Sequence, residues 1–160
     1  MISVYQLKPK FQQLLVPVLK CLHQQQITAN KITIAAMLWS AILGALLFLS
    51  PGHPVYLVAV AFGLLVRMAL NALDGMMART YNQQSKLGEV LNELGDVVSD
   101  TLIFCGLFGF SFSNKALVFA FIVLSVMNEF AGVMAKLISG TRRYDGPMGK
   151  SDRALLIGAW

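Results

Sequence analysis

Most of the acidic residues of this 160-residue chain lie in one stretch, 71–100. Five of the eight acids are there, namely Asp74, Glu89, Glu93, Asp96 and Asp100. The stretch lies where two apolar runs meet. Acids at the edge of a membrane usually mark an ion, a substrate path or a proton relay. We therefore expect the functional site in this stretch.

The spacing of the polar residues predicts two stripes that face one another. Arg67, Asn71 and Asp74 recur at i, i+4 and i+7, so on a helix they share one face. The second stripe recurs at i, i+3, i+4, i+7 and i+11 and consists of Glu89, Asn92, Glu93, Asp96 and Asp100. A hairpin between the two helices brings the stripes together. Facing carboxylates repel unless cations lie between them, and oxygen ligands of this kind suit Mg²⁺ or Mn²⁺.

Small residues and an arginine complete the set. Gly75, Ala78 and Gly88 would let a ligand approach the backbone closely. Arg79 is placed to clamp a phosphate group. The pattern therefore favours a site for a phosphate-bearing ligand and a divalent cation.

The last acid of the stretch is expected to serve the structure. Asp100 lies deeper in the apolar part of its helix than the other acids. A charged group at such a depth needs a partner. We expect Asp100 to pair with Arg67, or with Asn128 and Glu129.

The stretch resembles the signature of the CDP-alcohol phosphatidyltransferases. That signature reads D-x-x-D-G-x-x-A-R, then about eight residues, then G-x-x-x-D-x-x-x-D. The gap here is the eight residues TYNQQSKL, and the positions that match are Asp74, Gly75, Ala78, Arg79, Gly88 and Asp96. The polar turn 30–33 also looks like an N-terminal motif of the family. The resemblance covers essentially the whole chain, within a bacterial inner-membrane branch of the family.

The resemblance implies a metal-dependent phosphotransfer. Acids hold Mg²⁺ or Mn²⁺ against the pyrophosphate of a CDP-linked lipid such as CDP-diacylglycerol, an acceptor alcohol attacks, and CMP leaves. It makes Asp96 the general base, which also lies beside the metals, and Asp74 a metal ligand. Binding of the CDP moiety falls to Gly75, Ala78, Arg79 and Gly88, and binding of an anionic acceptor to Lys150 and Arg153. Homodimers are usual in the family.

Two positions depart from the signature. The first and third acids of the family are Asn71 and Asn92 here, and an amide oxygen is a weaker ligand for a hard cation than a carboxylate. Glu93 has a longer side chain that could swing into the place beside Asn92. Three functions stay open: an active transferase, a relative that binds a CDP-lipid without turnover, and a small ion or proton transporter.

The elements that position these residues are predicted to be membrane-spanning helices. The chain is 56% hydrophobic and 13% charged, against about 25% charged residues in an average soluble domain. We expect an all-α polytopic bundle with spans at about 32–49, 55–73, 88–112 and 116–138. The apolar run 154–160 is shorter than the about 20 residues of a span. Since the family has six spans, we expect the chain to be truncated within a fifth.

The N-terminal part is predicted to be an amphipathic helix. Its apolar residues recur at helical spacing between lysines and glutamines in 7–23. Such a helix could lie in the membrane interface or pack on the rest of the protein. We expect one domain, 1–160, with the interfacial helix in 1–30 and the bundle in 31–160.

The charge pattern indicates a membrane protein rather than a nucleic-acid-binding one. The net charge is +5, but the basic residues flank apolar runs instead of forming a stripe with interleaved aromatics. The positive-inside rule places the N-terminus, the stretch 71–100 and the loop 139–153 on the cytoplasmic side. We therefore expect a multi-pass protein of the inner membrane with a cytoplasmic active site.

Overall fold

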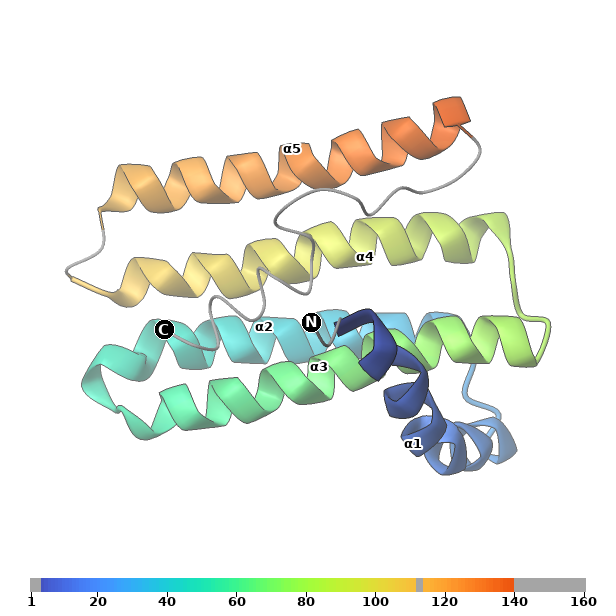
Figure 1. Ribbon diagram of the computed structural model, residues 1–160. Helices are drawn as coiled ribbons and strands as arrows, with labels where there is room; N and C mark the ends of the chain where they lie inside the picture. The colour runs from blue at the N-terminus through green and yellow to red at the C-terminus, as the bar shows by residue number, and fades with distance from the viewer. Residues whose placement is uncertain (1–3, 112–113, 140–160) are drawn as a thin grey trace.

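The computed structural model describes residues 4–111 and 114–139, and helices joined by short turns make up that part of the chain (Figure 1). No strand occurs in these ranges. The elements are α1 (Val4–Gln24), α2 (Ala29–Leu49), η1 (Ser50–Gly52), α3 (Val55–Thr80), α4 (Lys86–Cys105), η2 (Gly106–Gly109) and α5 (Lys115–Ser139). The predicted all-α class is confirmed.

The helix that carries the first half of the motif is longer than predicted. α3 continues to Thr80, whereas the apolar run ends at Leu73. Asp74, Gly75 and Arg79 are therefore helical residues, and the loop before α4 is only 81–85. The helix α4 closes in the 3-10 turn η2, while the predicted end of this span at 112 lies outside the described residues.

Three of the described helical segments are long and apolar enough to cross a membrane, at Ala29–Gly52, Val55–Thr80 and Lys115–Met134. The helix α4 does not meet this criterion because acids are spread along it, at Glu89, Glu93, Asp96 and Asp100. It nevertheless packs along α2 within the same bundle. Its 20 residues correspond to a length of about 30 Å. The span predicted at 88–112 therefore stays a prediction, which the place of α4 in the bundle supports.

The helix α2 is the centre of the bundle. It packs closely against both α3 and α4, whereas the backbones of α3 and α4 barely approach one another. Glycines allow the contact with α4. A Cβ on Gly44 would overlap the carbonyl oxygen of Leu102, and one on Gly106 would lie 2.6 Å from the carbonyl oxygen of Gly44. Small residues permit such close helix packing in membranes.

The helix α1 lies across α3 (Figure 1). Leu15 and Leu19 are buried in a core cluster that also contains Leu73 and Met77. On its other side, Leu14 is 73% exposed. Packing of α1 on the protein is thus confirmed, and its place in the membrane interface stays a prediction that the exposed apolar side supports.

Two turns at one end of the bundle hold the motif in place. The side chain of Gln83, in the loop before α4, accepts a hydrogen bond from the backbone N–H of Ala29 at 2.8 Å. The His23 ring, near the end of α1, stacks on Tyr81 with centroids 3.5 Å apart. Ser85 caps α4 by accepting from the N–H of Gly88. The starts of α2 and α4 are therefore fixed to the end of α3.

Candidate active site

Asp74 is buried and its carboxylate is oriented by two donors. Its side chain lies on α3 with 5% of the residue exposed. The Thr33 hydroxyl, on α2, donates to Oδ2 at 3.1 Å, and the N–H of Gly75 donates to Oδ1 at 2.6 Å. Thr33 is itself buried. The one acid of the motif that remains on α3 is therefore held in place from the central helix.

Asn71 and Asp96 meet across the space between α3 and α4. The Asn71 amide donates to Oδ1 of Asp96 at 3.4 Å, and both side chains are half-buried. This contact confirms that the two predicted stripes face one another. The amide N–H lies where the family signature has its first acid, so a donor rather than a negative charge faces Asp96.

One turn further into the bundle, a buried ion pair links the same helices. Arg67 donates from Nη2 to Oδ1 of Asp100 at 2.5 Å and from Nε to Oγ of Ser40 at 3.0 Å. Ser40 in turn donates to the carbonyl of Ala36. The side chains of Arg67 and Asp100 are 6% and 8% exposed. Of the partners expected for Asp100, Arg67 is confirmed, and Asn128 is exposed on α5.

The small residues of the motif have neighbours that explain their size. The exposed guanidinium of Arg79 lies over Gly75, where a Cβ would be 3.4 Å from both of its terminal nitrogens. A Cβ on Gly88 would lie 2.9 Å from Oδ1 of Asn30. Gly88 thus allows α2 and α4 to approach. Ala78 packs at the edge of the core cluster beneath α1.

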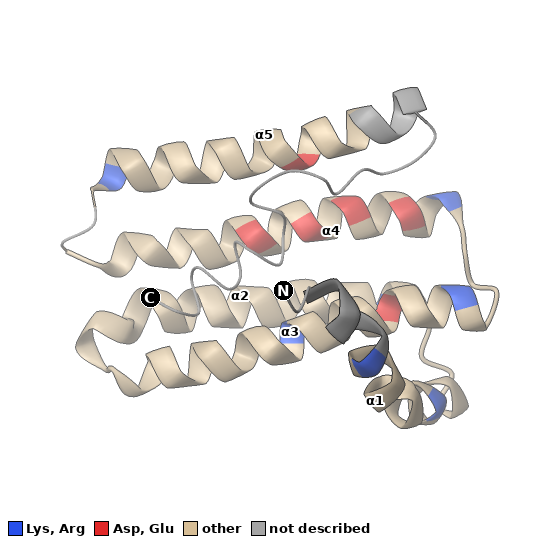
Figure 2. Cartoon of the chain, in the orientation of Figure 1, with Lys and Arg blue, Asp and Glu red and all other residues tan. Residues whose placement is uncertain are grey.

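The remaining site residues lie along α4 or beyond the described part of the chain. Asn92 and Glu93 are half-buried on α4. Figure 2 shows acids along α4 and one acid on α3 toward the end that bears the motif loop. Lys150 and Arg153, expected at the acceptor, lie outside the described residues.

The donor set fits a hard divalent cation, with few carboxylates. Within the described ranges no group of three or more His, Cys, Asp or Glu side chains is placed to hold a metal ion. Asp74 and Asp96 supply carboxylates, and Asn71 and Asn92 supply amide oxygens. Mg²⁺ is usually bound through one or two carboxylates and completes its shell with water and substrate phosphates. Two carboxylates and two amides are compatible with that mode.

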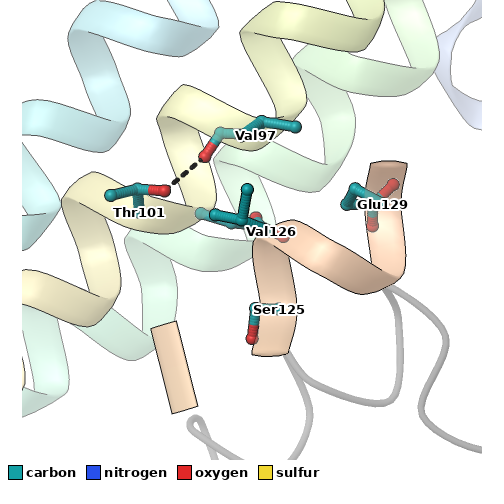
Figure 3. Close-up of a pocket in the computed structure, with 6 residues that line it drawn as sticks. Val97, Thr101, Ser125, Val126 and Glu129 are labelled. Atoms are coloured by element: carbon teal, nitrogen blue, oxygen red, sulfur yellow. Dashed lines mark hydrogen bonds between the residues drawn. The ribbon is translucent and has the colours of Figure 1, made fainter. Parts of the chain in front are cut away.

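A shallow pocket lies beside the site, between α4 and α5 (Figure 3). Its lining residues are Val97, Asp100, Thr101, Ser125, Val126 and Glu129. The hydroxyls of Thr101 and Ser125 donate to carbonyls of their own helices, each at 2.8 Å. Glu129 is 9% exposed. Sequence reasoning linked Glu129 with Asp100, and the structure places both at this pocket.

The sequence did not predict the contacts that two residues of the site, Thr33 and Ser40, make with α3. Thr33 belongs to the turn 30–33 that looked like a family motif, yet its bond to Asp74 spans 41 positions. Ser40 carried no signal, because a serine within an apolar helix commonly bonds its own backbone. Both contacts depend on how α2 is rotated toward its neighbours.

Comparisons with known proteins agree with the motif. The family model described as CDP-alcohol phosphatidyltransferase matches residues 26–159. The chain is 46% identical over 158 residues to a protein of Escherichia coli (strain K12) named inner membrane protein YnbA, and the match covers 99% of this chain and 78% of that protein. The match of the family model includes the whole of α2 to α5, and with them Asp74, Asn71 and Asp96. The chain belongs to the CDP-alcohol phosphatidyltransferase family.

Proposed function

We propose that the protein transfers a phosphatidyl group from a CDP-linked lipid, such as CDP-diacylglycerol, to an acceptor alcohol with release of CMP. The observation that carries the proposal is the meeting of α3 and α4 at Asn71 and Asp96, beside the buried Asp74. The two acids of the signature that this chain retains thus belong to one site. Family membership supports phosphatidyl transfer in general.

In the proposed reaction Asp96 is the general base. The acceptor hydroxyl oxygen attacks the phosphorus that carries the lipid, its proton passes to Asp96, and the bond from this phosphorus to the CMP oxygen breaks. The N–H of Asn71 on Oδ1 of Asp96 orients the carboxylate. A base must lie within hydrogen-bond reach of the proton that it takes.

The CDP moiety would bind beside the end of α3. Arg79 is exposed there and carries the positive charge nearest to Gly75. An arginine forms strong charge-assisted hydrogen bonds to phosphate. Gly75, Ala78 and Gly88 keep this region free of bulky side chains, and Lys150 and Arg153 are proposed to contact an anionic acceptor.

The residues that would hold Mg²⁺ or Mn²⁺ are Asp74, Asp96, Asn71 and Asn92, with Glu93 as a further donor beside Asn92. A bound divalent ion would neutralise charge on the pyrophosphate oxygens and on the leaving group. Asp74 contributes an oriented carboxylate, because Thr33 and Gly75 fix its plane. Asn71 and Asn92 contribute no negative charge, so less charge faces the phosphates than in the family signature.

We place the site in the inner membrane, on the cytoplasmic side. The related protein of E. coli is named for that membrane. The apolar helical segments described above are long enough to span it. Lys31, Arg79 and Lys86 lie at the end of the bundle that bears the motif loop, and the positive-inside rule favours the cytoplasmic side for such an end.

A second candidate is a protein that binds the CDP-lipid without turnover. It is favoured by Asn71 and Asn92, which replace two acids of the signature. It differs from the first in one respect, because it requires binding of the nucleotide but no release of CMP.

The test is a titration of the purified protein with CDP, with and without Mn²⁺, followed by an assay of CMP release from CDP-diacylglycerol with a panel of alcohols. We expect Mn²⁺-dependent binding that disappears in Asp74→Asn. The matched control is Glu129→Gln, the same chemical change at another buried acid. Binding without CMP release would select the second candidate. Absence of metal-dependent binding would refute both.

A further inference from the structure

The two helices that carry the motif are held in register by few contacts. The backbones of α3 and α4 barely approach one another, and each packs mainly on α2. Apolar packing between them therefore cannot alone decide which residue of α4 lies opposite Asn71. Packing of both helices on α2 contributes to that register, and side chains that reach across the space add to it.

The strongest of these contacts is the ion pair of Arg67 and Asp100, at 2.5 Å. It ties three helices together, because Arg67 also donates to Ser40 of α2. The ion pair also has the same helix register as the contact of Asn71 with Asp96. The residue numbers 67 and 100 sum to 167, as do 71 and 96. In two antiparallel helices, pairs with equal sums belong to one alignment, here separated by one turn.

A shift of α4 along its axis would break this pair. One residue corresponds to about 1.5 Å of helix rise, and the bond to Asp100 is short. Both charges are buried, and a buried charge without its partner is strongly unfavourable. The pair therefore penalises every alignment except the one that places Asp96 opposite Asn71.

We propose that Arg67 and Asp100 are positioning residues that set the register of α3 against α4 and thereby place Asp96 for its reaction. The inference rests on the proposed function for its effect on activity, but the register itself can be measured separately. It goes beyond the signature, which contains neither residue.

The first variant removes both charges, as Arg67→Leu with Asp100→Leu. Replacing a buried ion pair by apolar residues is often neutral for stability or favourable, so the protein should fold while the constraint on register is lost. The second variant exchanges the charges, as Arg67→Asp with Asp100→Arg, and should restore the constraint. The third, Arg67→Lys, keeps the charge but has a single nitrogen in place of the two that contact Ser40 and Asp100.

The readout of register is a pulsed electron paramagnetic resonance distance between spin labels on α3 and α4. Labels are attached at Met68→Cys and Val98→Cys, both exposed positions. Cys21 and Cys105, which are free and exposed, are replaced by serine. We expect one narrow distance with the native pair, a broad or shifted distribution with the two leucines, and a narrow one with the exchanged pair.

The readout of function is the rate of CMP release and the affinity for CDP with Mn²⁺. A misplacement of about 1 Å can cost about a hundredfold in rate, so we expect the leucine variant to lose at least about tenfold. The exchanged pair should recover most of that loss. A purely structural pair would change melting temperature while kcat, CDP affinity and the label distance stay unchanged.

An unchanged distance and unchanged affinity in the leucine variant would overturn the proposal. If that variant does not fold, Arg67→Lys decides instead, and an unchanged distance, affinity and rate there would overturn it equally. If the native protein neither binds CDP nor releases CMP, the proposed function fails. The label distances then still show whether the pair sets the register.

Discussion

The hydroxyl of Thr33 offers the sharpest test of how the site is built. Thr33 donates to Asp74 at 3.1 Å and lies 3.2 Å from the carbonyl of Ala29, yet it has a single proton. A carboxylate is the stronger acceptor, so the proton belongs to Asp74. The substitution Thr33→Val removes that donor and keeps the shape of the side chain. Both residues are buried, so water cannot easily replace the lost bond.

The magnitude follows from the charge of the acceptor. A hydrogen bond to a charged group contributes about 1.5–3 kcal/mol. At about 1.4 kcal/mol per factor of ten, this corresponds to about 10- to 150-fold. We expect Thr33→Val to weaken Mn²⁺-dependent CDP binding, or to lower the rate of CMP release, by about tenfold or more. The measurements are a CDP titration, a rate assay and a melting curve on the same preparation.

The matched control is Thr101→Val, the same change on α4. The hydroxyl of Thr101 donates to the carbonyl of Val97 in its own helix, and not to a carboxylate as the hydroxyl of Thr33 does. Loss of the Thr101 hydroxyl should leave CDP binding and the rate of CMP release unchanged. If Thr33→Val and Thr101→Val had equal effects on CDP binding and on the rate, the orientation of Asp74 by α2 would not matter for function, and the reasoning would be refuted.

Three further predictions concern packing, charge and the nucleotide. Gly106→Ala should lower the free energy of unfolding by about 1–3 kcal/mol, because the added Cβ overpacks against backbone. The control Gly52→Ala should leave it unchanged, because nothing lies within 4 Å of its added Cβ. Equal melting temperatures of the two variants would contradict this prediction. Asn71→Asp should raise the affinity for Mn²⁺ because a second carboxylate is added, and isothermal titration measures it; a lower affinity would show that the amide belongs to a different working site. Arg79→Ala should weaken CDP binding and leave the melting temperature unchanged because the side chain is exposed, whereas the exposed Lys86→Ala serves as its control and should bind CDP normally.

The apolar runs and the polar spacing were sufficient to predict much of this structure. Hydrophobic runs located α2 and α5 to within a few residues. The i, i+4 spacing placed Arg67 and Asn71 on one face of α3, and their partners lie on α4 as expected. The extension of α3 to Thr80 was not predicted, because its last turns are polar and give no hydrophobic signal.

The contacts of α2 could not be predicted from the sequence. This helix is apolar on nearly all sides, so its sequence does not indicate which side faces α3 and which faces α4. The bonds of Thr33 and Ser40, and the approach of Asn30 to Gly88, all follow from that rotation. It is fixed instead by glycines such as Gly44, whose partners on α4 appear only in three dimensions.

The acids of α4 have a consequence for how the protein enters the membrane. An isolated helix with a charged residue at its centre carries an insertion cost of about 2.5–3.5 kcal/mol for each such residue, and α4 carries several acids. Its Asp100 is neutralised by Arg67 of α3, which is synthesised first. The two helices should therefore partition into the bilayer together as a hairpin, and a chain ended before α4 would leave the charge of Arg67 in α3 without the carboxylate of Asp100. Protease protection of such a shortened chain, compared with one in which Arg67 is replaced by Leu, would measure how far biogenesis depends on this pair.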